Sequence, residues 1–350
     1  RIVQTGTQSR SAAGVRSAIQ YIHEGKLGKI LVARGLCYKR RRSIGRVRGV
    51  QPIPETVDYD LWTGPARLEG LRRERLHYDW HWVWNTGSGD IGNQGIHQMD
   101  IARWALGVNS LSSRVTSFGG RYGYIDDGQT PNTQIAIHEF EPGSSPYADG
   151  RPLLIFEVRG LDTEGYRGVK TGNVIECERG YLTLDTGGGR AFDNDGNQIR
   201  TFERGTPAGG DHYENFIAAV RSRDASTLRS DILEGHLSSA LCHTGNISHR
   251  LGEPVAIDTA TSAAEQIAAS AGEGVERLWQ HVGRQYVDYV LGFGRKVVVK
   301  NGIDPVAGLR LVQGPSLEMN AARERFTNSE SAHGLLRRDY RAPYVVPDVV

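Results

Sequence analysis

Residues 79–107 read DWHWVWNTGSGDIGNQGIHQMDIARWALG, and this stretch of the 350-residue chain decides the interpretation of the fold. Three tryptophans precede a cluster of glycines, and the glycines lead into apolar residues at helical spacing. This periodicity predicts a helix over 94–106, with Ile96, Met99, Trp104 and Leu106 among its apolar members. The glycines would let a ligand approach the N–H groups that the first turn of a helix leaves free.

The glycines themselves match a known spacing. Gly87, Gly89 and Gly92 fit the G-x-G-x-x-G pattern of dinucleotide-binding loops. We reject that interpretation, because the preceding residues are polar and rich in tryptophan instead of forming a buried strand. No strand–helix–strand unit with a ribose-binding acid follows them either. The glycines are better explained as leaving room for a ligand beside the backbone.

His97 lies in the first turns of the predicted helix, close to the polar residues Asn93, Gln94 and Asp100. Imidazole titrates near neutral pH, which suits a group that accepts or donates a proton during catalysis. A single histidine is more often structural than catalytic, so both roles stay open. Trp80, Trp82 and Trp84 have two interpretations as well, as platforms for a sugar ring or as core residues.

The rest of the chain is interpreted outward from this helix. Upstream, residues 1–6 should form a strand, 11–25 a helix capped by Ser11, and 30–33 a second strand, which together make one crossover of a parallel sheet. Residues 40–86 are irregular, and such a long loop usually serves function or covers a site. The downstream expectations are strands at 113–122, 134–140, 153–158, 174–177, 181–184 and 198–202, and helices at about 210–222, 229–251 and 261–279.

This order predicts a fold that combines α/β and α+β features. A remnant of a doubly wound parallel sheet comes first. A domain with a large, open, mostly antiparallel or mixed sheet follows, with helices on one face. The composition is that of a folded protein, with 38% hydrophobic and 23% charged residues, and no apolar stretch reaches the ~20 residues of a membrane span.

Charge and cysteine content exclude several functions. The net charge of +2 does not suggest nucleic-acid binding. Lys39–Arg42 form a basic run that is either a solvated loop or a contact for an anionic ligand. The three cysteines are far apart and imply no disulfide framework. Histidines at 77, 81, 236, 243 and 249 lack the further ligands of a metal site, so we expect none.

Residues 79–107 resemble the substrate-site motif of the Gfo/Idh/MocA family, named after glucose–fructose oxidoreductase and inositol dehydrogenase. In that motif a glycine run leads to Asp-x-Gly-x-His-x-x-Asp and then to Trp-Leu-Leu-Gly. The resemblance extends to VQTGTQSRS (3–11), GKLGKILVARG (25–35), DYDLWTGPA (58–66), HYENFIAAVRSRD (212–224) and RRDYRAPYVVP (337–347).

The resemblance implies a two-domain enzyme. An N-terminal Rossmann domain would bind NAD or NADP, and the sheet face of a C-terminal domain would assemble a homo-oligomer, a dimer or tetramer. The given chain contains neither the family's Glu-Lys-Pro motif nor a dinucleotide fingerprint. We therefore expect residues 1–38 to be the end of the Rossmann domain and 39–350 the substrate and oligomerisation domain. The fragment by itself is expected to be inactive.

The resemblance also implies site residues. His97 would handle the hydroxyl proton of the substrate, with Asn93 beside it where the family has an acid. Because asparagine cannot ionise, Asn93 can orient an imidazolium but cannot stabilise it by charge. His81 stands where the family has an arginine. Substrate contacts are expected from Trp80, His81, Trp82, Tyr38, Lys39 and Asp100, and cofactor contacts from Gln8 and Arg10.

Three functions follow as alternatives. The first is an NAD(P)-dependent oxidoreductase acting on a secondary hydroxyl of a sugar, cyclitol or related polyol. The second is an NAD-dependent glycosidase that works by transient oxidation and elimination. The third is a non-catalytic module for sugar binding or assembly. The expected partners are a carbohydrate and further copies of the chain, without nucleic acid or membrane. The sequence does not assign a compartment: the alternatives are the cytoplasm, or the periplasm if an export signal precedes Arg1.

Overall fold

The computed structural model describes residues 1–205, 208–291, 310–345 and 347. Within these residues, twelve strands form one mixed sheet, in the order β12-β11-β2-β3-β4-β1-β5-β6-β7-β8, with β10 and β9 attached beside β2. The strands are β1 (Ile30–Cys37), β2 (Arg114–Gly120), β3 (Thr133–Glu139), β4 (Leu153–Arg159), β5 (Thr171–Cys177), β6 (Gly180–Leu184), β7 (Gly189–Phe192), β8 (Gln198–Phe202), β9 (Glu253–Val255), β10 (Leu311–Gln313), β11 (Leu317–Asn320) and β12 (Arg325–Phe326).

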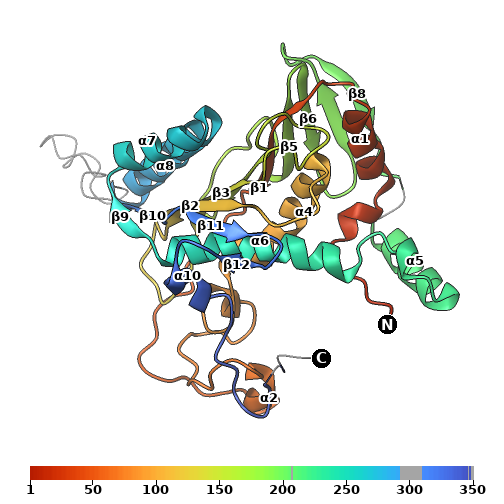
Figure 1. Ribbon diagram of the computed structural model, residues 1–350. Coiled ribbons are helices and arrows are strands. Elements are labelled where there is room, and N and C mark those ends of the chain that lie inside the picture. Colours follow the sequence, from red (N-terminus) through yellow and green to blue (C-terminus); the bar gives the residue numbers. More distant parts are fainter. Residues whose placement is uncertain (206–207, 292–309, 346, 348–350) are drawn as a thin grey trace, which may run out of the picture.

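Helices surround this sheet (Figure 1). The α-helices are α1 (Ala13–His23), α2 (Tyr59–Thr63), α3 (Gly89–Asn93), α4 (Gly95–Leu106), α5 (Ala208–Ser222), α6 (Ile232–Arg250), α7 (Ile257–Ile267), α8 (Ala269–Leu291) and α10 (Glu330–Gly334). Three 3₁₀ turns complete the set, η1 (Gln8–Ser11), η2 (Asp79–Trp82) and η3 (Ala225–Thr227). No helix in the described part of the chain combines the length and the hydropathy that crossing a bilayer requires.

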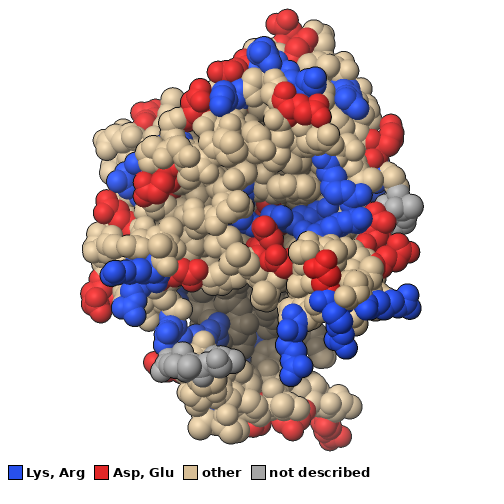
Figure 2. Space-filling model, turned by 45° about the vertical axis from the view of Figure 1, so that its right-hand side comes forward, with Lys and Arg blue, Asp and Glu red and all other residues tan. Residues whose placement is uncertain are grey.

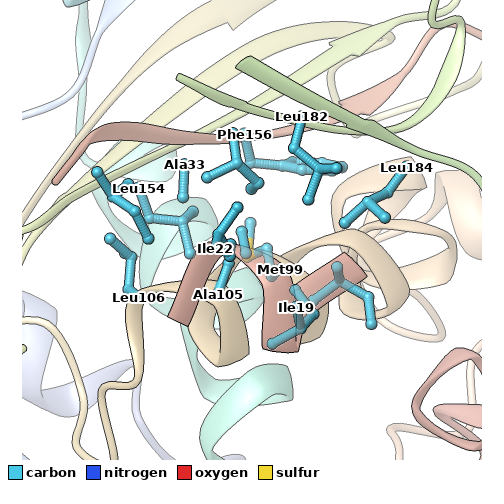
Figure 3. Packing of buried hydrophobic residues seen from close by; sticks show 14 of the residues in the cluster. Ile19, Ile22, Ala33, Met99, Ala105, Leu106, Leu154, Phe156, Leu182 and Leu184 are labelled. Carbon is cyan, nitrogen blue, oxygen red and sulfur yellow. The ribbon is translucent and has the colours of Figure 1, made fainter. Parts of the chain in front are cut away.

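Alternate residues of the central strands pack into two separate hydrophobic cores, because successive side chains of a strand point to opposite faces of the sheet. On one face, Ala33, Ala136 and Phe156 pack against α1, α4 and α6. Figure 3 shows Ile19 and Ile22 of α1 together with Met99 and Ala105 of α4 beneath this face. On the other face, alternate positions such as Val32, Ile135 and Ile155 pack against α7 and α8.

The two-faced packing corrects part of the expected architecture. The large mixed sheet is confirmed, but helices lie on both of its faces instead of one, because α7 and α8 cover the region of β2, β3 and β4. The single helix expected at 261–279 is two helices, which meet at the extended residue Ala268.

The start of the chain also differs from expectation. Residues 1–6 form no strand, and Gln4 makes only an isolated bridge with Asp231. Strand β1 instead lies inside the large sheet, parallel to β4 and antiparallel to β5, so the predicted strand–helix–strand crossover is wrong. Helix α1 forms as its apolar spacing predicts, but Ser11 does not cap it; its hydroxyl is hydrogen-bonded to Nδ1 of His212. The division of the chain between residues 38 and 39 stays a prediction.

Candidate functional site

The candidate site is built on the start of α4. Gly95, its first residue, packs directly on the ring of Phe156 from β4, and a Cβ there would come within 2.8 Å of a ring carbon. At the other end, Gly107 adopts a left-handed conformation with φ of 66°, which ends the helix. The glycines at both ends therefore fix the position of α4, and with it His97, against the sheet.

His97 lies on the first turn of α4 and is half-buried. Its Nδ1 atom is covered, and no hydrogen-bond partner for it exists within the described residues. Burial lowers the pKa of His97, the charge of Lys39 lowers it further, and Asp100 acts in the opposite direction. The imidazole is therefore neutral near pH 7, which is the form that accepts a proton.

Lys39 reaches the same place from the end of β1. Its ammonium donates a hydrogen bond to Oε1 of Gln94, the residue that precedes α4, and Nε2 of Gln94 donates to Oε1 of Gln98 at 3.3 Å. The structure thus places Lys39 at the start of the helix that carries His97, close enough for its charge to act on the imidazole. Gln94 is the link between them.

Tyr38 and Lys39 are neighbours in sequence but belong to different environments. The hydroxyl of Tyr38 donates to Oε2 of the buried Glu157 at 2.6 Å. Glu157 also receives hydrogen bonds from Arg34, Arg159 and Arg277. Arg277 lies on α8, which covers the second face of the sheet. Tyr38 therefore joins this cluster of arginines, while Lys39 joins His97.

Asn93 is placed next to a carboxylate that the sequence interpretation missed. Its Nδ2 atom donates to Oδ1 of Asp90 at 3.4 Å, and no hydrogen bond to His97 is formed among the described residues. Asp90 is almost fully buried in α3 and receives two hydrogen bonds of 2.7 Å from the guanidinium of Arg41. The basic run alone did not identify this pair, because the burial of Asp90, which makes a partner necessary, is a property of the folded chain.

The aromatic residues that precede the glycine cluster lie mostly inside the protein. His81 is fully buried; its Nδ1 donates to the carbonyl of Tyr78, and its Nε2 lies 4.0 Å from Oδ1 of Asp90. Trp82 is also buried and stacks with Arg121, whose guanidinium carbon is 4.8 Å from the ring centroid. Trp80 is half-buried. The substrate contacts expected of these three residues stay predictions. Other parts of the protein cover the side chains of His81 and Trp82.

Asp100 and Arg10 form a buried ion cluster behind the helix. Nε of Arg10 donates to Oδ2 of Asp100 at 2.7 Å, and Ser238 donates to the other carboxylate oxygen at 2.8 Å. Arg10 also pairs with Glu234 at 2.8 Å, and Arg103 contacts both acids. This cluster ties η1 to α4 and α6. Gln8, the other expected cofactor residue, is half-buried in η1.

Figure 2 shows a hollow in the molecular surface between the main body and the lower part, with Lys and Arg side chains on both sides of it. Two further cavities lie elsewhere. One of about 530 Å³ is lined by Leu31, Glu176 and Tyr181, and one of about 860 Å³ by Leu233 and Met319. In the described part of the chain, no three His, Cys, Asp or Glu side chains gather closely enough to hold a metal ion.

Comparison with known families explains this arrangement. Residues 22–118 match the model of the Gfo/Idh/MocA oxidoreductase family, C-terminal alpha/beta domain. The matched segment contains Lys39, Asn93 and His97. The resemblance to the Gfo/Idh/MocA oxidoreductase family that the sequence indicated is confirmed over this segment. No curated protein matches the chain.

Solved structures resemble the chain more distantly. A protein from Thermotoga maritima described as an oxidoreductase is 16% identical with a TM-score of 0.45, over 70% of this chain and 60% of that one. The WlbA dehydrogenase from Bordetella pertussis, solved with NADH and UDP-GlcNAcA, is 15% identical with a TM-score of 0.41, over 69% and 58%. An oxidoreductase from Agrobacterium radiobacter, solved with NAD+, L-tartaric acid and magnesium, is 11% identical with a TM-score of 0.40, over 70% and 60%. The chain thus spans less than two thirds of each.

Proposed function

We propose that the protein is an NAD(P)-dependent oxidoreductase that oxidises or reduces a secondary hydroxyl carbon of a sugar, cyclitol or related polyol. The observation that carries this proposal is the position of His97, a neutral, half-buried imidazole at the start of a helix within the segment that matches the family. An acceptor for a hydroxyl proton needs this protonation state at neutral pH.

The proposed role of the chain is to bind the polyol and move its proton. During oxidation, the O–H bond of the substrate breaks and the proton passes to an unprotonated ring nitrogen of His97. The charge of Lys39 opposes protonation of His97, while Asp100 favours it. Together with burial, which has the largest effect and lowers the pKa of His97, these two groups set the pH at which His97 exchanges its proton. Asn93 orients the loop through Asp90 and adds no charge.

The cofactor, NAD or NADP, would supply the hydride acceptor or donor. The described residues do not form a complete dinucleotide site. Arg10 is engaged with Asp100 and Glu234, and the glycines at 87–92 follow the 3₁₀ turn η2 instead of a buried strand. We therefore propose that other residues of the whole protein hold the dinucleotide, with Gln8 at the edge of its site. We also propose homo-oligomers that assemble through the exposed part of the sheet.

The test uses the full-length gene product and measures NAD(P)H formation with a panel of sugars and cyclitols. For at least one substrate, His97→Gln should lower kcat by about 10²- to 10⁴-fold. His236→Gln is the matched control, because His236 is exposed and pairs with Glu324. Absence of NAD(P)H with every substrate, or full activity in His97→Gln, would refute the proposal. Release of free sugar from glycosides without net NADH would favour the glycosidase instead.

A further inference from the structure

The basic run at the end of β1 is part of an extended segment, which we call the strap and define as residues 39–48. Arg41 fixes it to α3 through Asp90, and the backbone N–H of Arg41 donates to the carbonyl of Gly160 at 2.7 Å. Further along, the backbone N–H groups of Ile44 and Val47 donate to Asp126 and Asp127 at 2.8 Å. The strap is therefore held in place along its whole length.

The strap carries more positive charge than its neighbours neutralise. Of its basic residues, Arg41 alone has a carboxylate within 4.0 Å in the described part of the chain. The nearby Asp126 is already paired with Arg121 at 2.7 Å. The cations that have no such partner are Lys39, Arg40, Arg42, Arg46 and Arg48. A ligand with negative charge would gain from this excess.

Lys39 is distinguished from the other cations by its position. Arg40 and Arg42 are exposed, whereas Lys39 is half-buried and donates to Gln94 at the start of α4. An ammonium has three N–H donors, so the hydrogen bond to Gln94 leaves two of them for a ligand.

We propose that the substrate carries an anionic oxygen group, a carboxylate or a phosphate, which binds the ammonium of Lys39 while a hydroxyl of the same molecule faces His97. The substrate is therefore a sugar acid or a sugar phosphate. This inference rests on the proposed function and names the substrate class for it.

The test measures binding to the purified chain without cofactor, by calorimetry and by the NMR signal of the His97 ring. The probes are D-glucuronate, D-galacturonate, D-glucose 6-phosphate and D-galactose 6-phosphate, with D-glucose and D-galactose as neutral counterparts. At least one anion should bind about tenfold more tightly than its neutral counterpart, as one charge-assisted hydrogen bond provides. The two kinds of anion distinguish a carboxylate from a phosphate.

Variants assign the effect to one residue. Lys39→Met should remove the preference for the anion, and Lys39→Arg should largely retain it. Arg40→Met is the matched control, since it removes the same charge from the adjacent, exposed residue and should leave the preference intact. Equal binding of anions and neutral sugars would overturn the proposal, and so would equal losses in Lys39→Met and Arg40→Met.

This experiment separates the inference from the proposed function, because binding is measured without hydride transfer. If the anion preference depends on Lys39 but the full-length protein transfers no hydride, the proposed function fails and the anion site stands. If anionic and neutral polyols are oxidised equally well, and Lys39→Met changes neither, the oxidoreductase stands and the anion site fails.

Discussion

The guanidinium of Arg41 and the carboxylate of Asp90 meet through two hydrogen bonds of 2.7 Å, which join the strap to the helix that precedes His97. The carboxylate of Asp90 has no exposed surface, and the side chain of Arg41 is 16% exposed. Such a paired geometry is among the stronger interactions that side chains form. The pair therefore fixes α3, which contains Gly89 and Gly92, against the strap.

We predict that Arg41→Met lowers the free energy of unfolding by about 3–5 kcal/mol, because it leaves the carboxylate of Asp90 buried and unpaired. Urea unfolding measures this change. Arg40→Met provides the comparison and should alter stability by no more than about 0.5 kcal/mol, as expected of an exposed site. If the two variants were equally stable, the pair would be unimportant for the fold.

We predict that two substitutions raise the pKa of His97. Lys39→Met removes a charge that lowers this pKa, and Asn93→Asp adds an anion near the ring. The NMR titration of the His97 ring protons measures both. Arg48→Met, an exposed substitution in the strap, should leave the titration unchanged. If neither variant shifts the midpoint upward, Lys39 and Asn93 are not electrostatic neighbours of His97.

We predict that the protein loses stability in acid because of the buried His138. It is fully buried in β3, and burial lowers its pKa to about 3. The unfolded chain binds a proton here near pH 6.5, so stability is full above that pH and falls as the pH decreases. Between pH 7 and 5 this one group should cost about 2 kcal/mol. His138→Gln should reduce the difference in unfolding free energy between these pH values by that amount, whereas the exposed His236→Gln should not.

We predict that the arginine cluster around Glu157, on the second face of the sheet, contributes strongly to the stability of the fold. Burial raises the pKa of this carboxyl group, but the charges of Arg159, Arg277 and Arg34 and the hydroxyl of Tyr38 outweigh burial and lower it to about 2. Glu157→Gln leaves these arginines without their shared partner and should cost about 3–5 kcal/mol in urea unfolding. The exposed Glu164→Gln is the control. A cost near zero would show that solvent neutralises the arginines.

Local patterns were sufficient for much of the fold. The apolar spacing of α4 and α6 and the alternation in β2, β3 and β4 place these elements within a few residues of their observed bounds. Strand β7 was missed because glycines at 187–189 indicate a turn. The pairing of β1 was also missed, since its partners in β4 and β5 lie more than a hundred residues away and no local pattern encodes them.

The candidate site was also predictable only in part, because some of its residues lie in recognisable local patterns and others do not. His97, Asn93 and Lys39 come from a recognisable motif and a basic run, and the structure brings them to one region. Tyr38 was grouped with Lys39, although successive residues of an extended segment point in opposite directions, and its hydroxyl binds Glu157. The role of Arg41 became visible only once Asp90 was seen to be buried, because burial is a property of the folded chain.

The central place of β1 in the sheet has a consequence for how the protein is made. Strand β1 leaves the ribosome long before either of its partners, because β4 ends at Arg159 and β5 at Cys177. At about 5–20 residues per second, β1 waits for roughly 6–24 s with both edges unpaired, until β4 has been made. The nascent chain therefore exposes an apolar strand during synthesis, and a chaperone that shields residues 30–37 in that interval would raise the yield of folded protein.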